Sequence, residues 1–269
     1  MEIEIDLKKS VQKNASDYFE KAKKAKKKVE GAKEAITMAK KKLEQLKKKA
    51  EKTEQKELEK QKAQKIKKQK KPEWYEKFRW FISSEGFLII GGRDATTNEI
   101  VIKKHTDKED YVSHTEISGS PFFVIKTKID GKTKTPGKET LQETADATCS
   151  FSSAWKLGLT STDTFWVMPE QVSKQTEAGE YMGKGSFMVR GKRNYVVGRI
   201  NMAVGKTDDD KVMCGPVEAI KKNCSTFFVI IQGKEKASDI AKQTKTELDA
   251  DPDDIIRVLP SGGMKITKN

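Results

Sequence analysis

The stretch Trp80–Glu99, WFISSEGFLIIGGRDATTNE, decides how the main folded part of this chain is expected to begin. It opens with an aromatic and apolar run, breaks at Ser84–Gly86, and continues as a second apolar run, Phe87–Ile90. Short apolar runs separated by a glycine-containing break are typical of paired strands. We therefore expect this stretch to start a β-sheet.

The residues after the second run predict a turn and the start of a helix. Gly91 and Gly92 end the run and are followed by Arg93 and Asp94, and the segment Thr96–Glu99 has the Thr-x-x-Glu spacing of a capping box. A strand, a glycine turn and a helix start leave backbone N–H groups free to meet an anion. The alternative is an ordinary hairpin followed by a buried Arg93–Asp94 pair.

The positive charge of the chain is concentrated in residues 1–72. The 269 residues have a mean hydropathy of −0.74 and a formal net charge of +14. Residues 1–72 hold 25 lysines, no arginine and 12 acidic residues, whereas the remaining 197 residues carry 29 basic and 28 acidic residues. A nearly neutral body with a cationic segment favours a polyanionic partner, and RNA fits better than an anionic membrane.

Cysteine and histidine usage argues against disulfides and zinc. Cys149, Cys214 and Cys224 are odd in number and form no Cys-x-x-Cys pair, which favours a reducing, cytoplasmic setting. His105 and His114 are the two histidines, so we expect no metal site and no cofactor. No apolar stretch approaches the roughly 20 residues that a membrane-spanning helix needs, which also favours a cytoplasmic protein.

Residues 1–72, here called the arm, are expected to be a helical, coiled-coil segment. Residues 1–9 alternate as a short strand or lead-in would, and from Ala15 to Ala50 apolar residues recur every three or four positions, which is typical of a coiled coil. We expect the helix to fold back or to end in a frayed lysine-rich stretch before Pro72. The arm is either a solvated helix or a rod that binds phosphates and releases counterions; its charge favours the rod.

The remaining sequence predicts an α+β domain with a largely antiparallel sheet and packed helices. We expect a core at residues 73–198 and a C-terminal α/β extension of the same domain at 199–269. The expected strands are Phe87–Ile90, Tyr111–Ile117, Phe122–Thr127, Thr164–Met168, Ser186–Arg190, Asn194–Val197, Phe227–Ile231 and Ile255–Leu259. The expected helices are Ile100–Lys104, Lys138–Leu157 and Ser238–Leu248.

The segment Arg190–Arg193 is a candidate nucleic-acid contact. Gly191-Lys192 is the expected turn of a hairpin that groups three cations, with Tyr195 available to stack on a base. Arginine forks pair bidentately with phosphate, which a bare run of charge does not do. The alternative is a solvated hairpin end. The lysines that could extend the same surface are Lys103, Lys104, Lys126 and Lys174.

Two further classes of function are compatible with the sequence. His114 beside Glu116, together with Asp94, could form the acid–base set of an RNA-processing enzyme. A histidine on an alternating strand is more often packed and hydrogen-bonded than catalytic, so we expect a protein that is not an enzyme. In the other class the coiled coil binds a second helix, as in a protein-interaction or adhesion module; the partner would be another protein or a second copy of this chain.

Several stretches in the same order resemble the NFACT-R domain. They are Trp74–Ser84 (WYEKFRWFISS), Gly91–Ala95 (GGRDA), His114 with Gly119–Pro121 (GSP), Val124–Lys126 (VIK), Ser153–Lys156 (SAWK), Trp166–Lys174 (WVMPEQVSK), Gly179–Tyr181 (GEY) and Lys184–Tyr195 (KGSFMVRGKRNY). This domain belongs to the NFACT family, which includes the nuclear export mediator factor, Tae2, RqcH and FbpA-type fibronectin-binding proteins. The amino-acid sequences of these stretches are similar to those of the archaeal members of the family.

The resemblance implies a role in ribosome-associated quality control. Family members bind large ribosomal subunits obstructed by peptidyl-tRNA, hold tRNA and rRNA, and support C-terminal tailing of the stalled chain, while the ribosome makes the bonds. Full-length members carry an NFACT-N domain and helix-hairpin-helix segments ahead of the coil, so we expect either the C-terminal part of a longer protein or a stand-alone version. The matched positions expected to contact RNA or support the domain are Arg93, Asp94, Asn98, His114, Arg190, Lys192 and Arg193.

Overall fold

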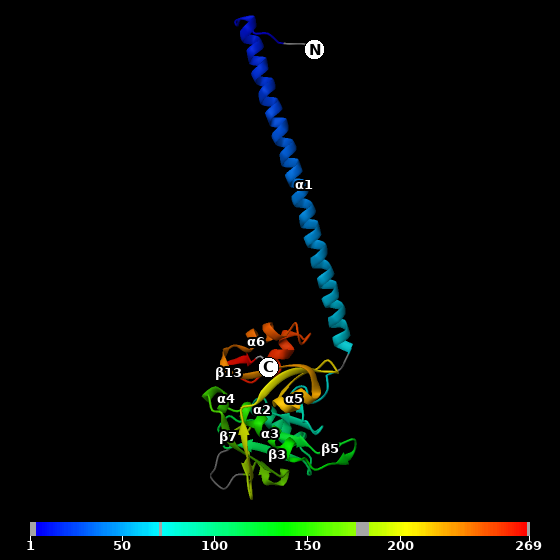
Figure 1. Ribbon diagram of the computed structural model, residues 1–269, viewed down its shortest axis with the longest axis vertical. Helices are drawn as coiled ribbons and strands as arrows, with labels where there is room; N and C mark the ends of the chain where they lie inside the picture. The colour runs from blue at the N-terminus through cyan, green and yellow to red at the C-terminus, as the bar shows by residue number, and fades with distance from the viewer. Residues whose placement is uncertain (1–3, 70–71, 176–182, 268–269) are drawn as a thin grey trace. The chain divides into compact units, whose positions relative to one another are not determined.

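The structure of the protein, a computed structural model, describes residues 4–69, 72–175 and 183–267. The chain divides into two compact units, Met1–Pro72 and Glu73–Asn269, the second of which we call the body (Figure 1). The predicted α+β class is confirmed, because the body combines antiparallel sheets with helices and a long helix precedes it. The division of the body at residue 198 stays a prediction.

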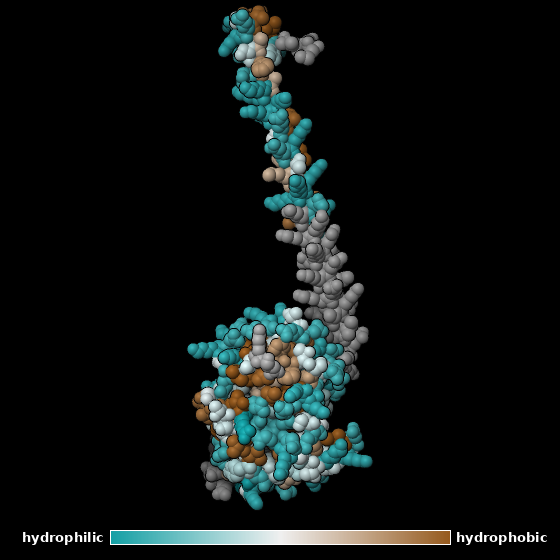
Figure 2. Space-filling view, viewed as in Figure 1, coloured by the Kyte–Doolittle hydropathy of each residue, from teal (hydrophilic) through white to brown (hydrophobic). Residues whose placement is uncertain are grey.

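Most of the described part of the arm is one continuous helix, α1 (Val11–Gln69). The fold-back alternative is therefore wrong for this segment. The described side chains of α1 are mostly polar and exposed (Figure 2). Its predicted apolar stripe is exposed as well, at Val29, Ile36, Leu43 and Leu46.

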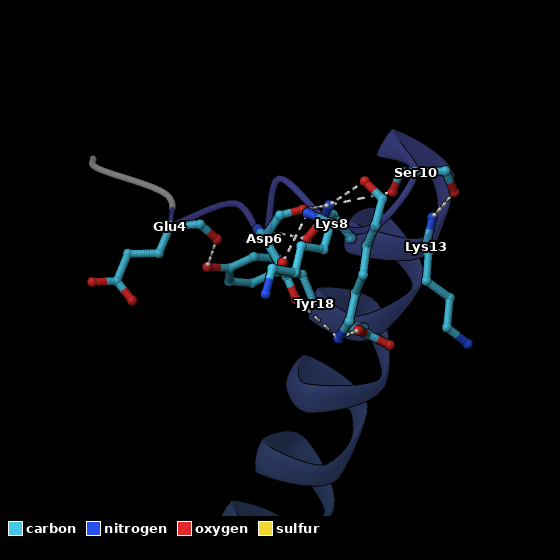
Figure 3. Close-up of polar contacts among 9 residues, drawn as sticks. Glu4, Asp6, Lys8, Ser10, Lys13 and Tyr18 are labelled. Atoms are coloured by element: carbon cyan, nitrogen blue, oxygen red, sulfur yellow. Dashed lines mark hydrogen bonds and ion pairs between the residues drawn. The ribbon is translucent and has the colours of Figure 1, made fainter.

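A short segment before α1 folds against the first turns of the helix. The buried Asn14 amide accepts a hydrogen bond from the backbone N–H of Asp6 at 3.0 Å and donates to the backbone oxygen of Asp6, also at 3.0 Å. The Tyr18 hydroxyl donates to the backbone oxygen of Glu4 at 2.7 Å. These contacts hold residues 4–9 as a turn that leads into the helix (Figure 3). The first three residues of the predicted lead-in lie outside the described part.

The first sheet of the body is antiparallel at every neighbouring pair. Its strand order is β1-β2-β4-β3-β7-β10. The strands are β1 (Arg79–Ile82), β2 (Leu88–Gly91), β3 (Tyr111–Thr115), β4 (Phe123–Lys126), β7 (Ser161–Val167) and β10 (Asn194–Arg199). The predicted strands at Phe87–Ile90, Tyr111–Ile117, Phe122–Thr127, Thr164–Met168 and Asn194–Val197 are confirmed, with shifts of one to three residues at their ends.

A second antiparallel sheet follows in the sequence, with the order β12-β11-β13-β14. Its strands are β11 (Met202–Thr207), β12 (Val212–Gly215), β13 (Cys224–Glu235) and β14 (Met264–Thr267). The smaller pairs are β5 (Lys128–Ile129) with β6 (Lys132–Thr133), and β8 (Val172–Ser173) with β9 (Met188–Val189). In the body, β13 and α6 gather at one end and β3, β5 and β7 at the other (Figure 1).

The helices of the body pack on these sheets around one apolar core. They are α2 (Ala95–Lys104), α3 (Lys138–Ser150), α4 (Ala154–Leu157), the 3-10 turn η1 (Pro169–Gln171), α5 (Val217–Asn223), α6 (Ala237–Thr244) and α7 (Pro252–Val258). The core includes Phe78, Phe81 and Phe123 from the first sheet region and Met202 and Ile230 from the second. No helix in the described part of the chain has the length and apolarity to cross a bilayer.

Three of the predicted elements are corrected by the structure. Ile255–Leu259 is not a strand: α7 occupies most of it, because the Asp251 side chain caps the helix start by accepting from Asp253 N at 3.0 Å, and Pro252 holds the first helical position. The predicted helix Lys138–Leu157 is two helices, α3 and α4, interrupted at residues 151–153.

The third correction concerns the predicted hairpin between residues 186 and 197. Strand β9 pairs with β8, and β10 pairs with β7, so Gly191-Lys192 does not join two paired strands. The Gln171 side-chain amide, one residue before β8, donates to the backbone oxygens of both Arg190 and Lys192 at 2.9 Å. This side chain holds the 190–192 segment beside β8, so the chain turns away from β9 before β10 begins.

Candidate nucleic-acid interface

Gly91, the last residue of β2, and Gly92 after it allow the chain to pass tightly over β4 and α2. A Cβ atom on Gly91 would lie 2.5 Å from Cε1 of Phe123, and one on Gly92 would lie 1.9 Å from Oδ1 of Asn98. The same Oδ1 accepts a hydrogen bond from the backbone N–H of Phe122 at 3.2 Å. The buried Asn98 therefore connects α2 to the residue before β4. Arg93 is the residue that comes immediately after Gly92.

A capping box starts α2, but it lies two residues earlier than the sequence spacing predicts. The Asp94 carboxylate accepts from Thr97 N at 2.8 Å, and the Thr97 hydroxyl oxygen accepts from Asp94 N at 2.9 Å. The hydrogen bond from the Thr97 backbone is the main reason that the pKa of Asp94 lies below its ordinary value. The role of Asp94 in this geometry is to cap a helix, and it has no ion pair with Arg93 within 4.0 Å among the described residues.

Glu99 fastens the 183–186 segment onto α2. Its carboxylate accepts from Gly185 N at 3.1 Å, pairs with Lys103 at 3.3 Å and forms an ion pair with Lys174. The bond from Lys174 is the first cause that lowers the pKa of Glu99 to about 2. Gly185 has a φ of +82° and a Cβ there would lie 2.5 Å from Cα of Ala95, so a side chain is excluded by both conformation and space.

A cleft of about 840 Å³ opens beside the start of α2. It lies between the end of β2, the loop from β3 to β4, the α3–α4 junction and the segment 184–189. Five predicted residues line it together: Arg93, Asp94, Asn98, His114 and Arg193. The charged side chains that sequence reasoning missed are Arg79, Lys156 and Lys184.

His114 forms part of an aromatic wall of this cleft. Its ring stacks on Phe122 with the ring centroids 3.9 Å apart and the planes at 9°, and its Nδ1 lies 3.0 Å from the backbone oxygen of Pro121. Burial lowers the pKa of His114 below its ordinary value, so the neutral imidazole donates from Nδ1 to that oxygen near pH 7. His114 therefore has the stacked, hydrogen-bonded environment of a structural residue.

Arg193 is charge-compensated within the cleft wall. Its guanidinium lies 4.8 Å from the centroid of the Phe165 ring and forms an ion pair with Glu116. Glu116 also accepts a hydrogen bond from the hydroxyl of the exposed Tyr195 at 3.1 Å. Arg193 and Tyr195 are thus joined through one carboxylate.

Within the described part of the chain Arg79 forms no such ion pair, and neither does Arg93, whose pKa is lowered by burial and by the positive charge of Arg257 and is raised only in part by the charge of Asp94. Cζ of Arg79 lies 4.2 Å from the centroid of the Phe151 ring, and its Nη1 donates to the backbone oxygen of Leu259 at 3.3 Å. Burial, and then the positive charge of Arg93, lower the pKa of Arg79 to about 10. The Arg93 Nη2 donates to the backbone oxygen of Phe78 at 3.0 Å, while its Nε is buried without a hydrogen-bond partner among the described residues. The sequence feature that could have marked Arg79 is its position between two aromatic residues, Phe78 and Trp80.

Comparison with known proteins shows which family this chain resembles. Residues 77–191 match the family model described as the NFACT protein RNA binding domain. The chain belongs to the NFACT family. An archaeal Rqc2 homolog, aRqcH of Methanocaldococcus jannaschii, is 42% identical over 215 residues, which are 77% of this chain and 31% of that protein. The predicted family and its archaeal type are thereby confirmed.

Eukaryotic relatives match a shorter part of this NFACT chain. The ribosome quality control complex subunit NEMF homolog of Drosophila melanogaster is 37% identical over 72% of this chain and 18% of its own length. The chain thus spans about a third or less of these relatives. The structure of the C-terminal part of the fibronectin/fibrinogen-binding protein from Streptococcus suis aligns with this chain at 18% sequence identity and a TM-score of 0.38. The alignment covers 48% of this chain and 46% of that one. So low a score supports no conclusion.

The other predicted residues of this NFACT chain lie outside the cleft lining. Lys126 is nearly buried and pairs with Asp107 at 2.9 Å and with Asp110. Lys104, Arg190 and Lys192 are exposed. Lys103 and Lys174 share Glu99. The RNA contacts assigned to all of these residues stay predictions, as they do for the five in the cleft. The described residues contain no group of three side chains suited to a metal ion.

Proposed function

We propose that this chain is the RNA-binding part of a ribosome quality control factor. The observation that carries the proposal is the match of residues 77–191 to the NFACT RNA binding domain, together with relatives named as ribosome quality control subunits. The factor binds large ribosomal subunits obstructed by peptidyl-tRNA and supports C-terminal tailing of the stalled chain. It works in the cytoplasm and contacts tRNA and rRNA.

The chemistry of this function is positioning, and the ribosome makes the peptide bonds. The arm supplies exposed lysines that neutralise phosphates, and the exposed Lys103, Lys104, Arg190 and Lys192 add cations from the body. An RNA-processing activity finds little support, because Asp94 caps α2 and His114 is stacked and hydrogen-bonded. A scaffold fits both arrangements.

Co-sedimentation with separated ribosomal subunits tests the proposal. Vacant large subunits are compared with large subunits that carry peptidyl-tRNA, with small subunits as the control. We expect the chain to sediment with large subunits and to be enriched on those that carry peptidyl-tRNA. Equal recovery with small subunits, or release of labelled tRNA fragments during the incubation, would contradict the scaffold role.

A second candidate function is binding of a partner helix by the arm. The exposed apolar stripe of α1, which includes Val29, Ile36 and Leu43, favours it because a 3.5-residue stripe is the usual contact face between helices. Such binding would survive nuclease treatment and would be lost when these residues are changed to glutamine. Loss of binding after nuclease treatment would instead assign the interaction to RNA.

A further inference from the structure

Two partly buried arginines, Arg79 and Arg93, line the cleft, and neither forms an ion pair with a described carboxylate. Among the described residues, neither Arg79 nor Arg93 has an acidic side-chain oxygen within 4.0 Å. The two acids that line the cleft have other roles: Asp94 caps α2, and Glu116 is paired with Arg193. Asp94 offsets part of the charge of Arg93, but Arg257 adds a further positive charge nearby. Withdrawing cations from water with so little counter-charge is costly, so this arrangement favours an anion.

We propose that the cleft binds a phosphate group between Arg79 and Arg93. The proposal rests on the proposed function, because the phosphate would be that of an RNA, and it specifies where and how the body holds it. The proposed function assigns to the arm phosphate contacts from a row of exposed lysines, whereas this site would hold one phosphate in a fixed geometry.

The contacts of the two arginines favour a directed site. Each guanidinium is held by one backbone carbonyl, Arg79 by Leu259 and Arg93 by Phe78, and each has further N–H donors. The buried Nε of Arg93 is one donor without a partner. The Phe151 ring, whose centroid lies 4.2 Å from Cζ of Arg79, and the Leu259 carbonyl together restrict the position of that guanidinium. Two anchored forks suit a phosphate, which offers several acceptor oxygens and accepts bidentate pairs.

The size and lining of the cleft favour a phosphate that is carried by a nucleotide. Its volume of about 840 Å³ lies within the usual range of about 300–1,000 Å³ for ligand pockets and is far more than a lone carboxylate needs. Lys156 and Lys184 add positive charge, and the aromatic rings of Phe122 and Phe165 add apolar wall. A phosphate at the arginines thus leaves room for a sugar or base.

Thermal unfolding of the full chain in inorganic phosphate tests the site directly. The ionic strength is held constant with sodium chloride, and acetate serves as the carboxylate control. Arg79→Gln and Arg93→Gln remove one fork each, and Arg93→Lys keeps the charge without the fork. The matched control is Arg199→Gln, which removes an exposed arginine that does not line the cleft. The unfolding transition itself reports whether each variant folds.

We expect phosphate to raise the midpoint of the native chain and of Arg199→Gln equally, and acetate to have no such effect. Loss of a charge-assisted contact should weaken phosphate binding about tenfold to a hundredfold in Arg79→Gln and Arg93→Gln, with Arg93→Lys between these and the native chain. Equal phosphate response in all folded variants, or an equal response to acetate, would overturn the site.

A pair of RNA oligonucleotides of one sequence, with a 5′-phosphate or a 5′-hydroxyl, identifies the source of the phosphate. Tighter binding of the 5′-phosphate form, lost in Arg93→Gln, assigns a terminal phosphate; equal binding of both forms, weakened in Arg93→Gln, assigns a backbone phosphate. The proposed function is tested separately, by co-sedimentation with large subunits. If the chain co-sediments but fails the phosphate test, the proposed function stands and this site is removed. Phosphate binding without co-sedimentation would do the reverse.

Discussion

Glu99 shows how one side chain can control a loop beside the cleft. Its pKa is lowered from 4.5 to about 2, first by Lys174 and then by Gly185 N. Because the folded-state pKa lies below the unfolded value, the contribution of Glu99 to stability is fully present above pH 4.5 and is lost as the pH falls towards 2. We expect Glu99→Gln to lower the unfolding midpoint at pH 7. The difference from the native chain should shrink across that window, and a constant difference would contradict this account.

Gly92 offers a second test at the scale of single residues. In Gly92→Ala the new Cβ would meet Oδ1 of Asn98 at 1.9 Å and displace the acceptor of Phe122 N. We expect a loss of about 1–3 kcal/mol in the free energy of unfolding, measured by denaturant titration. In an Asn98→Ala background the part of the cost that comes from Oδ1 should disappear, whereas the part that comes from the backbone N of Asn98, 2.8 Å from the new Cβ, should remain. An equal cost in both backgrounds would place the strain elsewhere.

The sequence pattern predicts strands correctly where a continuous apolar run lies buried in a sheet, and it fails where a short apolar run fits a helix as well as a strand. The runs Phe87–Ile90 and Phe122–Thr127 gave correct strands because both continue into a buried, antiparallel sheet. Ile255–Leu259 has the composition of a strand, yet Asp251 and Pro252 start a helix before it. A run of five residues carries no periodicity that separates the two, so the start signal decides.

This start signal gives a prediction at the scale of the element. Asp251→Ala removes the acceptor for Asp253 N and should lower the free energy of unfolding of the body by about 1 kcal/mol. Asp251→Asn retains an acceptor and should cost only a few tenths of that. Denaturant titration of both variants measures the difference. If the two variants lose equal stability, the charge of Asp251 and not its hydrogen bond matters.

At the scale of the whole molecule, the charge imbalance was predictable and the cleft was not. Lysine counts alone locate the cationic arm. The cleft joins Arg79 and Arg93, which lie at one end of the β1–β2 hairpin, with Arg193 and Ser261, which are distant in the sequence, so the tertiary fold is needed to bring all four together. The Gly-Gly-Arg-Asp motif singled out Arg93, which lines the cleft. The alternative interpretation of this motif paired Arg93 with Asp94, whereas the structure uses Asp94 as a cap. Arg79 had no local signal beyond its aromatic neighbours.

The division of charge between arm and body leads to the last prediction. The arm variant replaces four exposed lysines of α1 with glutamine: Lys23, Lys24, Lys27 and Lys28. The body variant makes the same change at four exposed lysines of the body: Lys132, Lys134, Lys221 and Lys222. Both variants therefore lose the same net charge from exposed positions. Binding of tRNA is measured from low to high salt for the native chain and for both variants.

If the arm lies along RNA, each lost phosphate contact removes about 0.7–0.9 from the slope of log K against log salt. We expect the slope of the arm variant to fall by up to about 3 and its affinity at low salt to drop, while the slope of the body variant changes little. Equal changes in both would mean that overall charge, and not the arm, attracts RNA. An unchanged slope in the arm variant would mean that its lysines serve only to keep a solvated helix in water, and the RNA-binding role would then rest on the body alone.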